Sequence, residues 1–157
     1  MATTFVFNIA KGRFAEFYNR VKNNDPSASA LVAVVVNTAA SDATLKDLDT
    51  LADVLADSDT DELNNSGYSR VVLTDSDLDP LSPDDSGDFM KITVPTLNFG
   101  EVEAGMDATN IIIGYDANTG SGTDADIIPV SCHEYAVSPN GTEMTATVGA
   151  FGLIQAA

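Results

Sequence analysis

The hydrophobic positions in the first quarter of the chain follow two different patterns. Four apolar positions spaced i, i+3, i+4 and i+7 predict a helix that begins near Arg13. These positions are Phe14, Phe17, Tyr18 and Val21. Pro26 ends this helix, because the residue before a proline resists the α region. The run Ala30 to Val36 shows no alternation and is rich in β-branched residues, which favours a strand covered on both faces.

The rest of the chain predicts a second helix and then a series of strands. Leu45, Leu48, Leu51, Ala52 and Leu55 form an apolar stripe, so we predict one helix over 44–55. Strand patterns follow at 68–73, 89–94, 97–102, 110–115 and 127–137. The Asn140-Gly141 pair favours a two-residue hairpin, which would pair 127–137 with the strand after the turn.

These elements predict an α+β fold. We expect two N-terminal helices plus an antiparallel β-sheet or β-sandwich of about five to seven strands. A chain of 157 residues is the size of one domain. Within the single domain 1–157 we expect a possible N-terminal arm at 1–12, a helix-strand-helix unit at 13–56 and a β-rich part at 68–157. No apolar run approaches the length of a membrane span, and the start of the chain lacks the features of a secretory signal.

The charge of the chain is large and unevenly distributed. The sequence holds 24 acidic and 7 basic residues, for a net charge of −17. Residues 1–25 carry four bases and two acids, a net charge of +2, which leaves −19 for residues 26–157. A body this acidic should repel nucleic acid and anionic lipid, so we expect neither as a partner. The basic segment would instead dock on an acidic surface, either that of its own body or that of a neighbouring subunit.

The residue types that carry enzyme chemistry do not form a convincing catalytic set. His133, the single histidine, lies between Cys132 and Glu134. Adjacent residues of a strand point to opposite faces, so Cys132 and His133 cannot act together as a nucleophile and its base. Phosphate-loop, dinucleotide-binding and nucleophile-elbow motifs are absent. The sequence therefore predicts a protein that is not an enzyme and uses no cofactor.

Two copies of the pattern VLxDSDxD, at 54–61 and 72–79, present alternating aspartates. This spacing opens a calcium-binding loop, but the glycine and glutamate that such a loop requires later are missing from both copies. Solvated acidic turns explain the pattern better, and a calcium site remains a weaker alternative. Its candidate ligands are Asp57, Asp59, Asp61, Asp75, Asp77 and Asp79.

The candidate partner-binding residues lie near the N-terminus. They are the basic residues Lys11, Arg13, Arg20 and Lys22 and the aromatic residues Phe5 and Phe7. Among the four bases, Lys11 and Arg13 are the first choice for docking charge. The apolar helix stripe that begins at Phe14 could also bind a partner, although such a stripe is more often core.

Several segments give the chain a resemblance to a family of tailed-bacteriophage structural proteins. The opening segments are FVFNIAKGR at 5–13, YNRVK at 18–22, NDP at 24–26 and ALV at 30–32. The later and weaker ones are ATLKD at 43–47, LA at 51–52, VLTD at 72–75, TDADIIP at 123–129 and NGTEMTA at 140–146. The resemblance extends from residue 5 to residue 146 and so spans most of the chain, and its segments carry no chemistry.

The resemblance implies a component of the virion that is assembled in the cytoplasm of a bacterial host. Our first hypothesis is a capsid decoration or cement protein, whose partners would be the major capsid protein and copies of itself, with a homotrimer as the expected oligomer. The alternative in the same particle is a neck or tail component. An acidic inhibitor or DNA mimic is the hypothesis from a different class.

Overall fold

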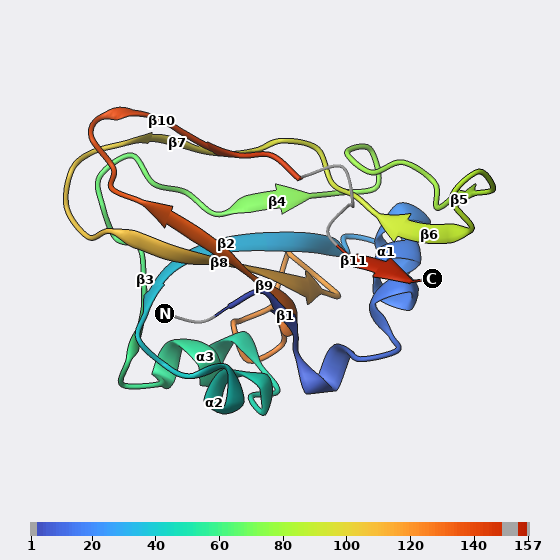
Figure 1. The fold of residues 1–157 in the computed structure, drawn as a ribbon, viewed down its shortest axis with the longest axis horizontal. Helices are drawn as coiled ribbons and strands as arrows, with labels where there is room; N and C mark the ends of the chain where they lie inside the picture. The colour runs from blue at the N-terminus through green and yellow to red at the C-terminus, as the bar shows by residue number, and fades with distance from the viewer. Residues whose placement is uncertain (1–2, 149–153, 157) are drawn as a thin grey trace.

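A six-stranded antiparallel sheet forms the centre of the molecule (Figure 1). In the computed structural model, which describes residues 3–148 and 154–156, the strand order is β1-β9-β8-β2-β3, and β4 also pairs with β2. The strands are β1 (Phe5–Val6), β2 (Ala30–Thr38), β3 (Thr60–Glu62), β4 (Val71–Leu73), β8 (Ala108–Asp116) and β9 (Ile128–Val137). Every pairing in this sheet is antiparallel.

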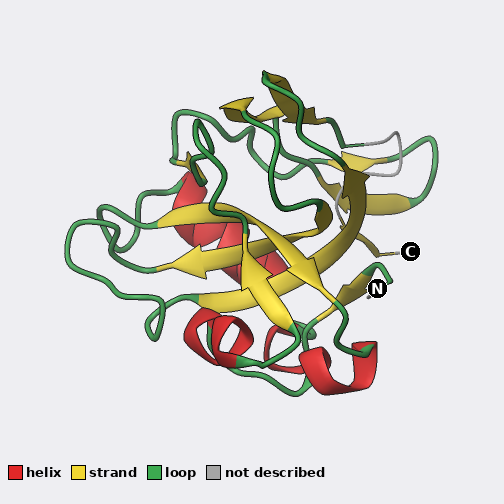
Figure 2. Ribbon diagram, turned by 90° about the vertical axis from the view of Figure 1, so that its left-hand side faces the viewer, coloured by secondary structure: helices red, strands yellow, loops and turns green. Residues whose placement is uncertain are grey.

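Two smaller antiparallel sheets and the helices complete the fold (Figures 1 and 2). One small sheet joins β7 (Leu97–Val102) to β10 (Thr142–Ala146), and the other joins β5 (Pro83–Asp84), β6 (Phe89–Ile92) and β11 (Ile154–Ala156). The helices are a 3-10 helix, η1 (Asn8–Ala10), and α1 (Phe14–Lys22), α2 (Asp42–Lys46) and α3 (Leu51–Ala56). The predicted α+β class with antiparallel sheets is confirmed in these coarse terms.

The number of strands differs from the prediction. The described residues form eleven strands, against about five to seven expected. Five of them, β1, β3, β4, β5 and β11, contain only two or three residues. A segment this short is too brief to show a two-residue period, so its pairing depends on the neighbouring strand.

Two hydrophobic cores cover the opposite faces of the central sheet. Strand β2 alternates between them: Leu31, Ala33 and Val35 belong to the core that includes α1, β7 and β10. Val32, Val34 and Val36 belong to the core that includes α2, α3 and the N-terminal segment. The prediction of a strand covered on both faces is therefore confirmed, and its apolar sequence follows from having no solvent-facing side.

Helix α1 forms where the apolar spacing predicts it. Phe17, Tyr18 and Val21 are buried, and Phe14 is half-buried. The ring of Phe17 stacks on the ring of Tyr115 of β8 with 4.8 Å between centroids. The apolar stripe of this helix is therefore core, and its polar face is left outside.

The single helix predicted over 44–55 is wrong, because the chain forms α2 and α3 with a break between them. The backbone N–H groups of Leu51 and Ala52 donate to the carbonyls of Ile127 and Asp124, at 2.9 and 3.0 Å. A continuous helix would need those groups for its own ladder. Thr50 begins the new helix instead, since its hydroxyl accepts a bond from the Asp53 N–H at 3.0 Å.

The predicted hairpin at Asn140-Gly141 is also wrong. Strand β10 pairs with β7 and leaves β9 to pair with β8 and β1. The turn still forms: Gly141 has a φ of 88°, and the side chain of Asn140 accepts a bond from the Thr142 N–H. The Gly141 N–H donates to the carbonyl of Val102, so the turn places the following strand beside β7.

The expected N-terminal arm is wrong for the described part of 1–12. Phe5 and Val6 pair with Cys132 and Ser131 of β9, and the Phe7 N–H donates to the Val130 carbonyl at 3.0 Å. Phe5 and Phe7 are 8% and 0% exposed and belong to the core above α2 and α3. The prediction that Phe5 and Phe7 bind a partner is therefore wrong, because both side chains are buried within their own chain. Met1 and Ala2 lie outside the described residues.

Replacing Ala28 by glycine is expected to raise the free energy of unfolding by about 0.5–1 kcal/mol. Ala28 has a φ of 69°, a left-handed conformation that a Cβ atom disfavours. Its carbonyl accepts two bonds from Thr119, which hold this conformation in place. Urea denaturation measures the change, with Ala33→Gly in β2 as a control that should destabilise. A lower stability for Ala28→Gly would contradict the argument.

Candidate functional site: the polar face of helix α1 and its surroundings

The polar face of α1 carries two arginines that share one carboxylate. Arg13 Nε lies 3.2 Å from Glu16 Oε2, and Arg20 Nε lies 2.9 Å from Glu16 Oε1. The side chains of Arg13, Glu16 and Arg20 are 46%, 41% and 48% exposed. The hydrogen bond from Arg13 is the largest cause of the lowered pKa of Glu16, so this carboxyl stays ionised. One net positive charge therefore remains on this face of an otherwise acidic molecule.

The buried face of the helix holds these arginines in place. The guanidinium of Arg13 lies over the ring of Phe17, 4.6 Å from its centroid. Because Phe17 is itself fixed against Tyr115, Arg13 has a rigid support. The geometry thus presents Arg13 and Arg20 together on one exposed surface that can bind an anionic group.

The other two predicted basic residues have different surroundings. Lys11 is exposed, and its Nζ donates to Asn8 Oδ1 at 2.5 Å. Lys22 is half-buried, and its Nζ donates to the backbone carbonyl of Asp75 at 2.9 Å. Lys22 therefore contacts the acidic loop of its own chain. An acidic surface of the same chain was one of the two docking surfaces expected for the basic segment.

The aspartates proposed as calcium ligands do not converge. The described residues contain no group of three or more His, Cys, Asp or Glu side chains able to hold a metal ion. Asp57 accepts the Asp59 N–H at 3.0 Å, and Asp77 accepts the Thr74 N–H at 2.8 Å, so both stabilise local turns. The repeated pattern is thus explained within the described chain by turn formation.

Calcium is expected to leave the thermal unfolding midpoint unchanged when added to about 1 mM. Cation binding would raise the midpoint by mass action, and it requires several oxygens at one point in space. Calorimetry with and without calcium measures the shift, with magnesium at the same ionic strength as the control. A rise specific to calcium would contradict the turn explanation.

His133 contacts Ser131, a pairing that was not among the sequence-based predictions. His133 Nε2 lies 2.9 Å from the hydroxyl of Ser131, two residues away on the same face of β9. Burial lowers the pKa of His133 to about 4, so the ring is neutral near pH 7. Ser131 is only 1% exposed, which leaves its hydroxyl without access for a substrate. The Ser-x-His spacing on a strand was the signal for this contact.

Cys132 points to the opposite face of β9, as predicted from strand geometry. It is fully buried in the core above α2 and α3. Burial raises the pKa of its thiol to about 12, so it remains a neutral thiol. Cys132 is therefore a core residue and not a nucleophile.

A cavity of about 340 Å³ opens beside His133 between the central sheet and the β7–β10 sheet. Apolar side chains of β7 and β8 and polar side chains of β9 and β10 line it. The lining includes Leu97, Ile111, Ile113, Tyr135 and Thr145. The hydroxyl of Tyr135 in β9 donates to the carbonyl of Thr145 in β10 at 2.8 Å. This bond ties the two sheets together across the opening.

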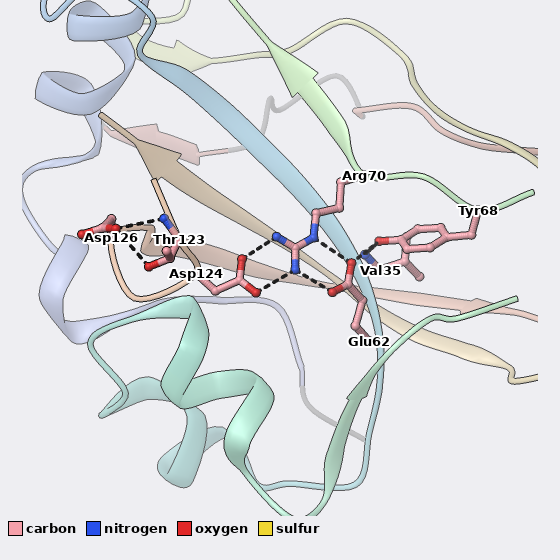
Figure 3. Close-up of polar contacts among 7 residues, drawn as sticks. All are labelled: Val35, Glu62, Tyr68, Arg70, Thr123, Asp124 and Asp126. Carbon is pink, nitrogen blue, oxygen red and sulfur yellow. Dashed lines mark hydrogen bonds and ion pairs between the residues drawn. The ribbon is translucent and has the colours of Figure 1, made fainter. Parts of the chain in front are cut away.

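A second charged cluster joins the end of β3, the start of β4 and the loop before β9 (Figure 3). Arg70 donates two hydrogen bonds to Glu62 and two to Asp124, with Nη2–Oε2 at 2.6 Å and Nη1–Oδ1 at 2.5 Å. Their side chains are 28%, 24% and 35% exposed. Hydrogen bonds from Arg70 hold the pKa of Asp124 below its usual range. Asp124 lies 54 residues from Arg70 in the sequence, so no local motif could have indicated the complete cluster.

Tyr68 connects this cluster to the central sheet. Its hydroxyl donates to Glu62 Oε1 at 3.1 Å and accepts the Val35 N–H at 3.0 Å. Val35 lies where β2 changes partner from β4 to β3, so Tyr68 supplies the hydrogen bond that the ladder lacks there. Arg70, Glu62, Asp124 and Tyr68 therefore act together to close the sheet edge and fix the loop before β9.

Comparisons with protein-family models, with curated proteins and with solved structures found no match to this chain. None of the helices in the described residues is long and apolar enough to cross a membrane. The candidate site is thus defined by its own geometry: an exposed pair of arginines on a rigid helix, set on an acidic body.

Proposed function

We propose that this chain is a structural protein of a tailed-bacteriophage particle, and specifically a decoration or cement protein that stabilises the capsid through subunit contacts. The observation that carries the proposal is the set of sequence segments, from 5–13 to 140–146, that resembles this class of virion proteins. The role is non-catalytic, and it needs no cofactor.

The architecture suits such a role. Both faces of the central sheet are covered, and Val72, at 47%, is the large hydrophobic side chain that stands exposed among the described residues. A net charge of −17 favours solubility before assembly. The exposed arginines of α1 provide a charged surface for contact with a capsid or a neighbouring copy.

The proposed partners are the major capsid protein and further copies of this chain, with a homotrimer as the proposed oligomer. Contacts made by exposed charges weaken with salt, since the Debye length is about 8–10 Å at physiological ionic strength. The protein would be made in the bacterial cytoplasm and would function in the virion.

Mass spectrometry of purified particles tests this function. The expected result is that the chain co-purifies with the major capsid protein through a density gradient and is released by high salt before the capsid breaks. Its absence from washed particles would overturn the proposal. Competition with duplex DNA for a DNA-binding enzyme would instead favour the acidic inhibitor.

A further inference from the structure

We propose that the arginine face of α1 docks on the acidic surface around α3 of a second copy, in a head-to-tail contact. This inference deepens the proposed function, because it names the surfaces through which copies of the chain would associate. It rests on the placement of charge in the fold.

The basic surface is small and well defined. Arg13 and Arg20 are exposed on α1, and in the described residues Glu16 is the carboxylate with which both form ion pairs. Each guanidinium has five N–H donors, and Glu16 engages the Nε of each arginine. Arg20 also interacts with the hydroxyl of Tyr115, and the donors that then remain on the two arginines can bind carboxylates of a partner. The two guanidiniums lie on either side of the Glu16 carboxylate.

The acidic surface lies elsewhere on the molecule. Asp49 precedes α3 and Asp59 follows it, and both side chains are exposed. Helix α3 has six residues, a length of about 9 Å. Asp47, Asp53 and Asp61 are exposed in the same segment. Lys46, the base of α2, is paired with Asp42.

The two surfaces are on opposite sides of the central sheet. Helix α1 packs on the core of one face, and α3 packs on the core of the other. Figure 1 shows α1 at one end of the sheet and α2 and α3 beneath its other part. A patch and its complement on different faces of one molecule cannot meet within that molecule. They can meet between copies, and such a contact forms a ring when its rotation closes.

The overall charge predicts an unusual salt dependence for this contact. At 0.01 M salt the Debye length is about 30 Å, so two copies that each carry −17 repel as whole bodies. At 0.15 M the Debye length is about 8 Å, so the repulsion between whole molecules is screened while ion pairs at short range still attract. At 1 M the Debye length is about 3 Å, so the exposed ion pairs are screened as well. Self-association should therefore be strongest near physiological salt and weaker at both extremes.

Sedimentation velocity with a charge swap tests the contact. Arg13→Glu with Arg20→Glu should weaken association on the order of tenfold, and Asp49→Lys with Asp59→Lys should do the same. The four changes together should restore it. Glu101→Lys with Asp107→Lys alters the net charge as much as the Asp49 and Asp59 changes do, at exposed positions of β7 and the loop after it, and should not weaken association.

The outcomes separate this inference from the proposed function. Circular dichroism confirms that each variant is folded. A wild-type protein that stays monomeric at all three salts, or a swap that fails to restore association, would overturn the contact. If each double variant weakens association and the four changes together restore it, the contact is supported. If the chain is nevertheless absent from particles, the virion function is contradicted while the contact is not.

Discussion

Replacing Phe7 by alanine is expected to lower the free energy of unfolding by about 3–5 kcal/mol. The side chain of Phe7 is 0% exposed and lies in the core with Val34 and Ile112 of the central sheet. Its ring meets the ring of Phe5 edge-on, with 5.1 Å between centroids. Alanine would leave a cavity that rigid strands cannot fill. Urea denaturation measures the loss.

Val72→Ala is the control for this experiment. Val72 is 47% exposed on β4, so its truncation should change the stability by less than about 0.5 kcal/mol.

Deletion of residues 1–12 should abolish cooperative folding, because it removes β1 and the buried ring of Phe7. A deletion variant that melts like the full chain would contradict this expectation and would support the N-terminal arm predicted from the sequence.

Replacing Arg70 by methionine is expected to cost about 2 kcal/mol near pH 7. The change removes four hydrogen bonds and leaves Glu62 and Asp124 as two neighbouring carboxylates without their shared cation. All three side chains are about a quarter to a third exposed, so the cost is below that of a fully buried pair. Arg13→Met, on the exposed face of α1, is the matched control and should cost less than about 1 kcal/mol.

The pH dependence of the Arg70→Met effect gives an independent check. Arg70 lowers the pKa of Asp124, so this pair contributes stability above the unfolded pKa of about 3.9 and loses it as pH falls through the folded value. The difference between wild type and variant should therefore shrink in acid. His133 also destabilises the fold below about pH 6.5, but it does so in both proteins and cancels. A difference that is constant with pH would argue against the ion pairs.

Local patterns in the sequence were enough to predict part of this fold. Helix α1 was predicted because its apolar side chains follow the helical period, and β2 because both of its faces are buried. The break between α2 and α3 was missed because it depends on bonds from Leu51 and Ala52 to a loop some seventy residues away. The pairing of β10 with β7 was missed for the same reason: local residues determine the turn at Asn140, but the strand that β10 pairs with lies far away in the sequence.

The candidate site divides in the same way. The exposure of Arg13 and Arg20 follows from helix periodicity, since they lie off the apolar stripe. Phe5 and Phe7 were assigned to a partner because two aromatic residues near a terminus give no sign of the strand that will cover them. The Arg70 cluster needs three segments to meet in space, so only the folded structure could reveal it.

Cryo-electron microscopy of the particle tests the central claim most directly. We expect copies of this fold on the outer surface of the head, on the order of hundreds per particle, with α1 of each copy facing an acidic surface of its neighbour. About six or twelve copies at one vertex would instead identify a neck component. A particle without density for this chain would contradict the proposed function.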